Sequence, residues 1–188
     1  MKKFALIALA ATSAFIAMPA AAQTVTGTIT LTGSVAPKCS VVPGGGSTFA
    51  DSVDFGELST ASGTLRAGLS AEFDAAVDDF QVVCTSANPV VSVTANPLAT
   101  AATAATGYDN SIDYDASVAF SLVAGGPTTV TDDSSIAGAT GTTLGARLAN
   151  ASNIHITANN FRTNAATDIL VASPTYSGTI SISIAPGV

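Results

Sequence analysis

Strict alternation of apolar and hydroxyl residues distinguishes the stretch from Thr24 to Val35. Threonine or serine occupies every even position. The odd positions carry Val25, Gly27, Ile29, Leu31, Gly33 and Val35. A period of two predicts one long β-strand with an apolar face and a hydroxyl face. At about 3.3 Å per residue this strand is roughly 40 Å long, and its apolar face needs a surface to pack against.

The same period returns at the end of the chain. There, Tyr176, Gly178, Ile180, Ile182 and Ile184 alternate with serine and threonine. Between the two ends, turn residues separate shorter runs that predict strands at 39–42, 52–58, 79–85, 90–95, 116–124, 128–131, 153–158 and 167–172. Residues 97–115 are small or polar and predict an exposed loop, and residues 59–76 show no clear pattern. This series of short strands predicts an all-β fold, specifically an immunoglobulin-like sandwich.

The first residues have the order of a secretory signal peptide. Lys2 and Lys3 precede an apolar run from Phe4 to Ala17, Pro19 interrupts it, and the alanines at 20–22 suit signal peptidase. The run is too short for a stable bilayer-spanning helix, which disfavours the alternative of an N-terminal membrane anchor. We therefore expect export, with cleavage near position 23.

Composition supports the strand prediction and limits the partners. Threonine, valine and isoleucine favour strands, whereas glutamate is rare and tryptophan is absent. Past the predicted cleavage site, four cations (Lys38, Arg66, Arg147 and Arg162) stand against thirteen carboxylates, a net charge near −9 (4 − 13). Four scattered cations do not form a phosphate-binding face, so we expect no nucleic-acid partner.

The two cysteines, Cys39 and Cys84, both follow the predicted leader. Export places them in an oxidising compartment, so we expect a structural disulfide. In the chain-entropy model, closing this loop removes about 4 kcal/mol of unfolded-state entropy. A metal site is the weaker alternative, because His155 is the single histidine of the chain.

Three further segments stand out by their order and spacing. They are Val-Ala-Pro-Lys-Cys-Ser-Val at 35–41, Asp-Phe-Gly at 54–56, and the closing alternating strand at 176–184. Together with the leader and the opening strand, they resemble the spore coat protein U-like family, many of whose members are pilins of archaic chaperone–usher systems. The similarity extends from about Thr28 to Ile184 and is looser in the middle. Gly178 departs from the pattern, because relatives often carry an acidic residue there.

The resemblance implies a domain organisation and a mechanism of assembly. A signal peptide would cover 1–22, a donor strand 23–35, and an incomplete immunoglobulin-like pilin domain 36–188. In such pilins the last strand is missing, and a periplasmic chaperone fills the resulting groove until the outer-membrane usher exchanges it for the next subunit's first strand. The implied donor residues are Val25, Gly27, Ile29, Leu31, Gly33 and Val35. The implied groove-bordering residues are Tyr176, Ile180, Ile182 and Ile184.

The implied function is a structural subunit of a cell-surface pilus that supports attachment or biofilm formation, assembled from copies of itself or related pilins. The alternative is a secreted or tip-located carbohydrate-binding module, for which Tyr108 and Tyr114 in the predicted loop are the aromatic candidates. Whether the first strand enters a neighbour or folds back into its own groove stays open.

Enzyme chemistry has little support in the sequence. The chain lacks the common nucleophile, zinc-protease, phosphate-loop and dithiol motifs, so we expect neither catalysis nor a cofactor. Asp109, Asp113 and Asp115 have the spacing of a partial calcium loop but lack its glycine and its closing glutamate.

Overall fold

The computed structural model describes residues 25–187. The predicted signal peptide, Gln23 and Thr24 lie outside the described residues. The chain divides into two units, residues 1–34 and residues 35–188. All helices and strands of the described residues belong to the second unit.

Antiparallel strands dominate the second unit. In chain order its elements are β1 (Cys39–Val42), α1 (Leu69–Ala76), β2 (Gln81–Cys84), β3 (Val90–Ala99), β4 (Tyr108–Asp109), β5 (Ser111–Phe120), β6 (Thr128–Asp133), β7 (Thr140–Thr143), β8 (Ile154–Arg162), β9 (Ile169–Leu170) and β10 (Ser177–Ala185). The pair β4–β9 is parallel and the other strand pairs are antiparallel. The prediction of an all-β fold class is thereby confirmed.

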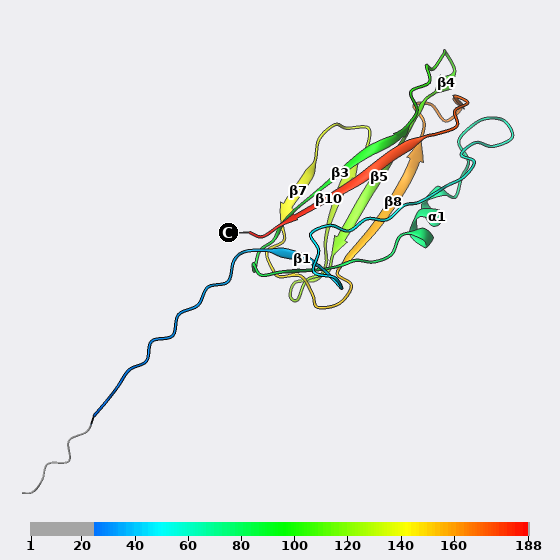
Figure 1. The fold of residues 1–188 in the computed structure, drawn as a ribbon. Helices are drawn as coiled ribbons and strands as arrows, with labels where there is room; N and C mark the ends of the chain where they lie inside the picture. The colour runs from blue at the N-terminus through cyan, green and yellow to red at the C-terminus, as the bar shows by residue number, and fades with distance from the viewer. Residues whose placement is uncertain (1–24, 188) are drawn as a thin grey trace, which may run out of the picture. The chain divides into compact units, whose positions relative to one another are not determined.

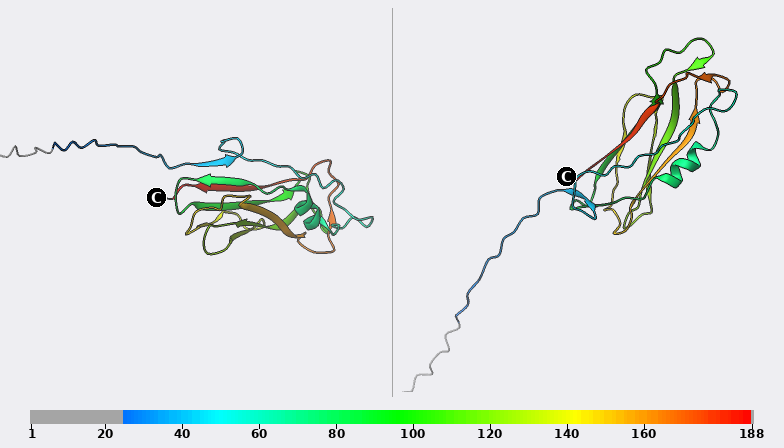
Figure 2. Two further views of the ribbon diagram at one scale, coloured as in Figure 1. Left: turned by 90° about the horizontal axis from the view of Figure 1, so that it is seen from below. Right: turned by 45° about the vertical axis from the view of Figure 1, so that its right-hand side comes forward.

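The main sheet opens into two layers because β3 and β5 diverge. β10, β3 and β7 pair in one layer, and β8, β5 and β6 pair in the other. β3 and β5 are joined where Leu98 pairs with Ile112 and Ala99 pairs with Ser111. Figure 1 shows β10 beside β3 and β8 beside β5, and Figure 2 shows the layers from two further directions. The hydrophobic core fills the space between the layers.

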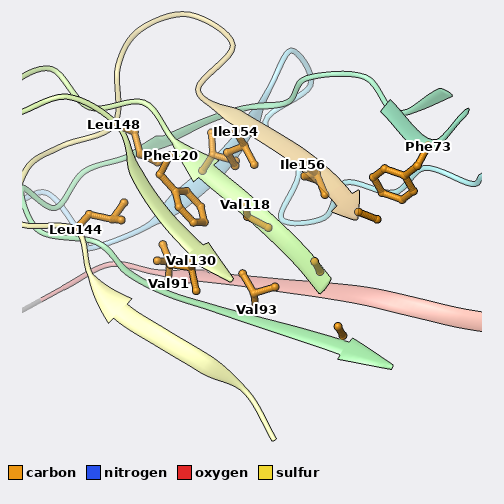
Figure 3. Packing of buried hydrophobic residues seen from close by; sticks show 14 of the residues in the cluster. Phe73, Val91, Val93, Val118, Phe120, Val130, Leu144, Leu148, Ile154 and Ile156 are labelled. Atoms are coloured by element: carbon orange, nitrogen blue, oxygen red, sulfur yellow. The ribbon is translucent and has the colours of Figure 1, made fainter. Parts of the chain in front are cut away.

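Both layers contribute side chains to this core. Every second residue of β5 is buried, as expected for a strand with one face against a core. Figure 3 shows Val91 and Val93 of β3 on one side of the space and Val118 and Phe120 of β5 on the other. The buried cluster comprises Phe73, Val82, Val91, Val93, Ala95, Tyr114, Ala116, Val118, Phe120, Val130, Leu144, Leu148, Ile154, Ile156 and Ala158.

Two buried polar side chains connect neighbouring parts of the fold. Asp132 of β6 accepts hydrogen bonds from the Ala95 amide at 2.8 Å and the Thr140 hydroxyl at 2.7 Å, so it links β6 to the opposite layer. Asn153 accepts from the Val82 amide at 2.9 Å and donates to the Val82 carbonyl at 2.7 Å. Because an unpaired buried polar group is costly, these pairings favour one arrangement of the strands.

The predicted disulfide between Cys39 and Cys84 is present. The two cysteines lie directly opposite each other in the β1–β2 pair. This pair forms a small sheet apart from the main one. The bridge therefore fastens β1, which begins the folded part of the chain, to the chain ahead of β3.

The predicted exposed loop over 97–115 is correct only for its middle, because residues 100–107 form no strand and are mostly exposed, whereas both flanks belong to strands. β3 continues to Ala99, and β5 begins at Ser111. The prediction failed for 111–115 because Asp113 and Asp115 lie on the outer face of β5 and alternate with buried residues of the inner face. Their charges conceal the period of two. The predicted strand at 116–124 is accordingly the second half of β5, which ends at Phe120.

The predicted strand at 52–58 is also wrong. Side chains form hydrogen bonds with main-chain groups that would otherwise pair in a sheet. The Asp54 carboxylate accepts the Gly56 amide at 2.9 Å, and the Arg66 guanidinium donates to the Phe55 carbonyl at 2.8 Å. Gly56 has a φ of 61°, which breaks the extended conformation. Local hydrogen bonds thus compete successfully with strand pairing here.

Candidate functional site

β10 forms the edge of its layer. It pairs with β3 on one side, and no other strand of the described residues pairs with its second side. Ile180, Ile182 and Ile184 are half-buried and pack against the core, whereas Ser181 and Ser183 are exposed. An open strand edge with apolar side chains beneath it is a template for a further strand.

An apolar groove lies beside this edge. Its main part has a volume of about 410 Å³ and is bordered by β10 and β8. A smaller cavity of about 60 Å³ lies beside Ile182, Ile184 and Cys39. Figure 1 shows the C-terminal end of β10 close to the start of β1. The apolar and aromatic residues lining the main part are Phe49, Ala50, Val53, Phe55, Phe73, Val77, Phe80, Leu98, Tyr114, Ile156, Ala158, Phe161, Ile180 and Ile182.

The segment 47–55 forms a wall of the groove without joining a sheet. It contains no strand and pairs with no strand of the described residues. Phe49 holds the segment on the domain, because its ring packs on Phe80 with centroids 4.6 Å apart. An added strand in the groove would find main-chain partners on β10 and on this segment.

Tyr114 of β5 contributes an uncharged aromatic floor to the groove. Its hydroxyl has two hydrogen-bond acceptors within reach, the Asn96 carbonyl at 2.9 Å and the Thr179 carbonyl at 3.0 Å. The Tyr114 ring stacks on Phe161 with centroids 5.3 Å apart, and Phe55 packs edge-on against Phe161 with centroids 5.6 Å apart. Burial raises the pKa of Tyr114 to about 12, so the hydroxyl stays protonated at physiological pH. The floor therefore suits an aliphatic ligand.

The apolar face predicted for the first strand is exposed in the structure. The structure assigns no strand to residues 25–35. The exposed fractions are 88% for Val25, 88% for Ile29, 89% for Leu31 and 79% for Val35. Full burial of such side chains is worth roughly 1.5–3 kcal/mol each, so this face has a strong tendency to bind an apolar surface.

The four residues predicted to border the groove are not all in it. Ile180 and Ile182 line the main part, and Ile184 lines the smaller cavity. Tyr176 instead precedes β10 and lines a neighbouring cavity of about 690 Å³, which shares Val53, Phe55 and Leu98 with the main part. Its hydroxyl donates to the Val171 carbonyl at 2.8 Å, which fixes the ring away from the groove.

The aromatic residues of the groove were missed from the sequence. Phe73 comes from α1, within the range 59–76 that shows no clear pattern, and Phe161 lies near the C-terminal end of β8. Phe49 and Phe55 belong to a segment without regular structure. In the sequence, the alternation of Tyr114 with its neighbours in β5 was the one available signal. Folding alone brings the other residues together.

The acidic residues considered as a calcium loop have other partners. Asp115 accepts a hydrogen bond from the Arg162 guanidinium at 3.0 Å. Asp109 is buried and accepts the Ser111 amide at 3.0 Å. Desolvation by burial raises the pKa of Asp113 above its ordinary value. Within residues 25–187, no group of three or more His, Cys, Asp or Glu side chains is placed to hold a metal ion.

The remaining candidate residues do not converge on one site. His155 is exposed, and its Nδ1 lies 2.7 Å from a carboxylate oxygen of Asp79. Tyr108 is 47% exposed, but Tyr114 is 3% exposed and belongs to the groove floor. The two tyrosines therefore do not form the shared aromatic surface that a carbohydrate-binding module would need.

Comparison of the chain with protein-family models, with curated proteins and with solved structures finds no match. Across the described part of the chain, no helix has the length and apolar character needed to cross a membrane. The groove beside β10 and the exposed segment 25–35 remain the features on which a function can be argued.

Proposed function

We propose that this chain is a structural subunit of an extracellular chaperone–usher pilus that polymerises by donor-strand exchange. Residues 25–35 of one copy would occupy the groove beside β10 of the next copy. The inserted segment would complete an immunoglobulin-like sandwich that a single chain leaves open. This proposal accounts for the resemblance to spore coat protein U-like pilins in the order of the sequence motifs.

One observation carries the proposal: the same chain has an exposed segment whose apolar residues alternate as in a strand, and an apolar groove beside an open strand edge. Each feature is unfavourable in water when left alone. Joining them buries both apolar surfaces and pairs main-chain groups on both sides of the added strand.

The dimensions and pattern of the two features also agree. β10 has 9 residues, and its inward residues alternate with outward hydroxyl residues. Residues 25–35 have the same alternation, with hydroxyl groups at every even position. A strand in this register would place aliphatic side chains over the aromatic floor and would extend the hydroxyl face of β10 into solvent.

The proposal implies a set of partners and a location. During transit a periplasmic chaperone would cover the groove, because an exposed apolar strand edge favours aggregation. An outer-membrane usher would exchange the chaperone for the next subunit. The assembled chain would be a cell-surface fibre that supports attachment or biofilm formation, and neither catalysis nor a cofactor enters this account.

A peptide-complementation experiment tests the proposed groove and donor segment. A chain lacking residues 23–34 is refolded with its disulfide intact and mixed with a synthetic peptide of residues 23–35. We expect a one-to-one complex by native mass spectrometry and a rise in melting temperature of more than about 10 °C, given several kcal/mol of buried apolar surface.

Matched peptides define the specificity of this complex. Ile29→Asp or Leu31→Asp in the peptide places a charge on the apolar face and is expected to abolish binding. Thr30→Asp places the same charge on the hydroxyl face and is expected to leave most of the binding intact. A truncated chain that is already stable and ignores all the peptides would refute the proposed function.

A further inference from the structure

Thr85 forms hydrogen bonds with Ala36 and Lys38, which lead into β1. The Thr85 hydroxyl accepts the Lys38 amide at 2.9 Å and donates to the Ala36 carbonyl at 3.1 Å. The Thr85 amide donates to the Lys38 carbonyl at 2.9 Å. Thr85 follows Cys84 directly, so these bonds continue the β1–β2 pairing beyond the Cys39–Cys84 bridge.

These contacts oppose a reversal of the chain between Ser34 and β1. A segment that folded back into its own groove would have to turn within residues 35–38. Such a turn needs the main-chain groups of Ala36 and Lys38, which Thr85 already occupies.

Strand direction also disfavours a return to the same groove. The smaller cavity brings Cys39 together with Ile184, so the C-terminal end of β10 lies near the start of β1. A segment that ends at Cys39 and lies in its own groove would therefore run parallel to β10. A segment from another copy can enter in the opposite direction and pair antiparallel, as the other strands of this main sheet do. Antiparallel pairing is slightly more stable per residue.

We propose that Thr85 is a positioning residue that holds residues 36–38 extended and thereby directs residues 25–35 to a second copy of this chain rather than to the chain's own groove. This inference rests on the proposed function, since it assumes that the segment is a donor strand. It adds the reason why the chain forms polymers instead of closed monomers.

Refolding of the full mature chain at low concentration tests the role of Thr85. Thr85→Val keeps the β-branched shape and removes the hydroxyl contacts, while Thr85→Ser keeps the hydroxyl and serves as the control. We expect Thr85→Val to raise the fraction of closed, protease-resistant monomer about tenfold, the scale set by the loss of one to two hydrogen bonds. Thr85→Ser should behave like the native chain.

A second variant tests the same inference in case Thr85→Val misfolds. A flexible insertion of six glycine and serine residues between Ser34 and Val35 leaves Thr85 untouched and moves the reversal away from residues 36–38. It is expected to produce the same closed monomers, identified by cross-links between residues 25–35 and β10 of one copy.

The outcomes separate the two proposals. If neither variant forms more monomer than the native chain, and all of them polymerise through the groove, the inference about Thr85 is wrong and the proposed function stands. If the native chain itself is a closed monomer with its segment cross-linked to its own β10, both are wrong.

Discussion

Substitution of Ile182 by aspartate is expected to abolish assembly of the chain into fibres. Ile182 lines both the main groove and the smaller cavity, so it lies where an inserted strand would make its central contacts. An aspartate there would lose its hydration without gaining a partner when the strand entered, a cost of several kcal/mol. Light scattering and electron microscopy of the refolded chain of residues 23–188 measure the result.

The matched control for this substitution is Ser183→Asp. Ser183 lies one residue further along β10 on the exposed face, so the control adds the same charge to the same strand without entering the groove. Fibres should form with the control and not with Ile182→Asp. Normal fibres from Ile182→Asp would mean that the groove is not the site of assembly.

Loss of the disulfide is expected to lower the free energy of unfolding by about 4 kcal/mol, as estimated for a closed loop with a separation of 45 residues. The bridge joins β1 to β2, and β1 has no other strand partner among the described residues. The double variant Cys39→Ser, Cys84→Ser also loosens the end of the groove, because Cys39 lines the smaller cavity. Urea unfolding followed by circular dichroism measures the change.

Reduction of the native chain provides the control for this second prediction. A reduced native chain and the double serine variant should unfold at the same urea concentration, well below that of the oxidised chain. If the oxidised and reduced forms differ by less than about 1 kcal/mol, the bridge is not a main source of stability, and the entropic estimate does not apply.

The elements predicted well from the sequence are those whose pattern is set by one buried face. β10 was predicted because its isoleucines alternate without interruption with hydroxyl residues, and β1 because the pattern restarts after Pro37 and ends at a glycine turn. The disulfide followed from the expectation of export. For the two strands, the local sequence was sufficient.

The elements predicted poorly depend on tertiary contacts. In β5, Asp113 and Asp115 look like loop residues until β8 supplies Arg162, whose guanidinium bonds to Asp115. The 52–58 range has the composition of a strand, but Arg66 and local carboxylates take its main-chain groups. No local pattern indicates such partners in advance.

Only part of the candidate site could be predicted from the sequence, because the rest depends on tertiary contacts. The apolar face of residues 25–35 and the isoleucines of β10 each follow from a period of two within one segment. The aromatic lining is drawn from α1, β5, β8 and the irregular segment 47–55, and no sequence period connects these parts. The orientation of residues 36–38 depends on Thr85, which is distant from them in sequence.

If one copy donates residues 25–35 and another accepts them beside β10, two complementary variants should restore each other's assembly when they are mixed. Ile182→Asp keeps an intact donor segment, and Leu31→Asp keeps an intact groove. Each variant alone should remain monomeric, and the mixture should form a one-to-one dimer and nothing longer, as determined by native mass spectrometry. A mixture that stays monomeric, or either variant forming fibres alone, would contradict donor-strand exchange through this groove.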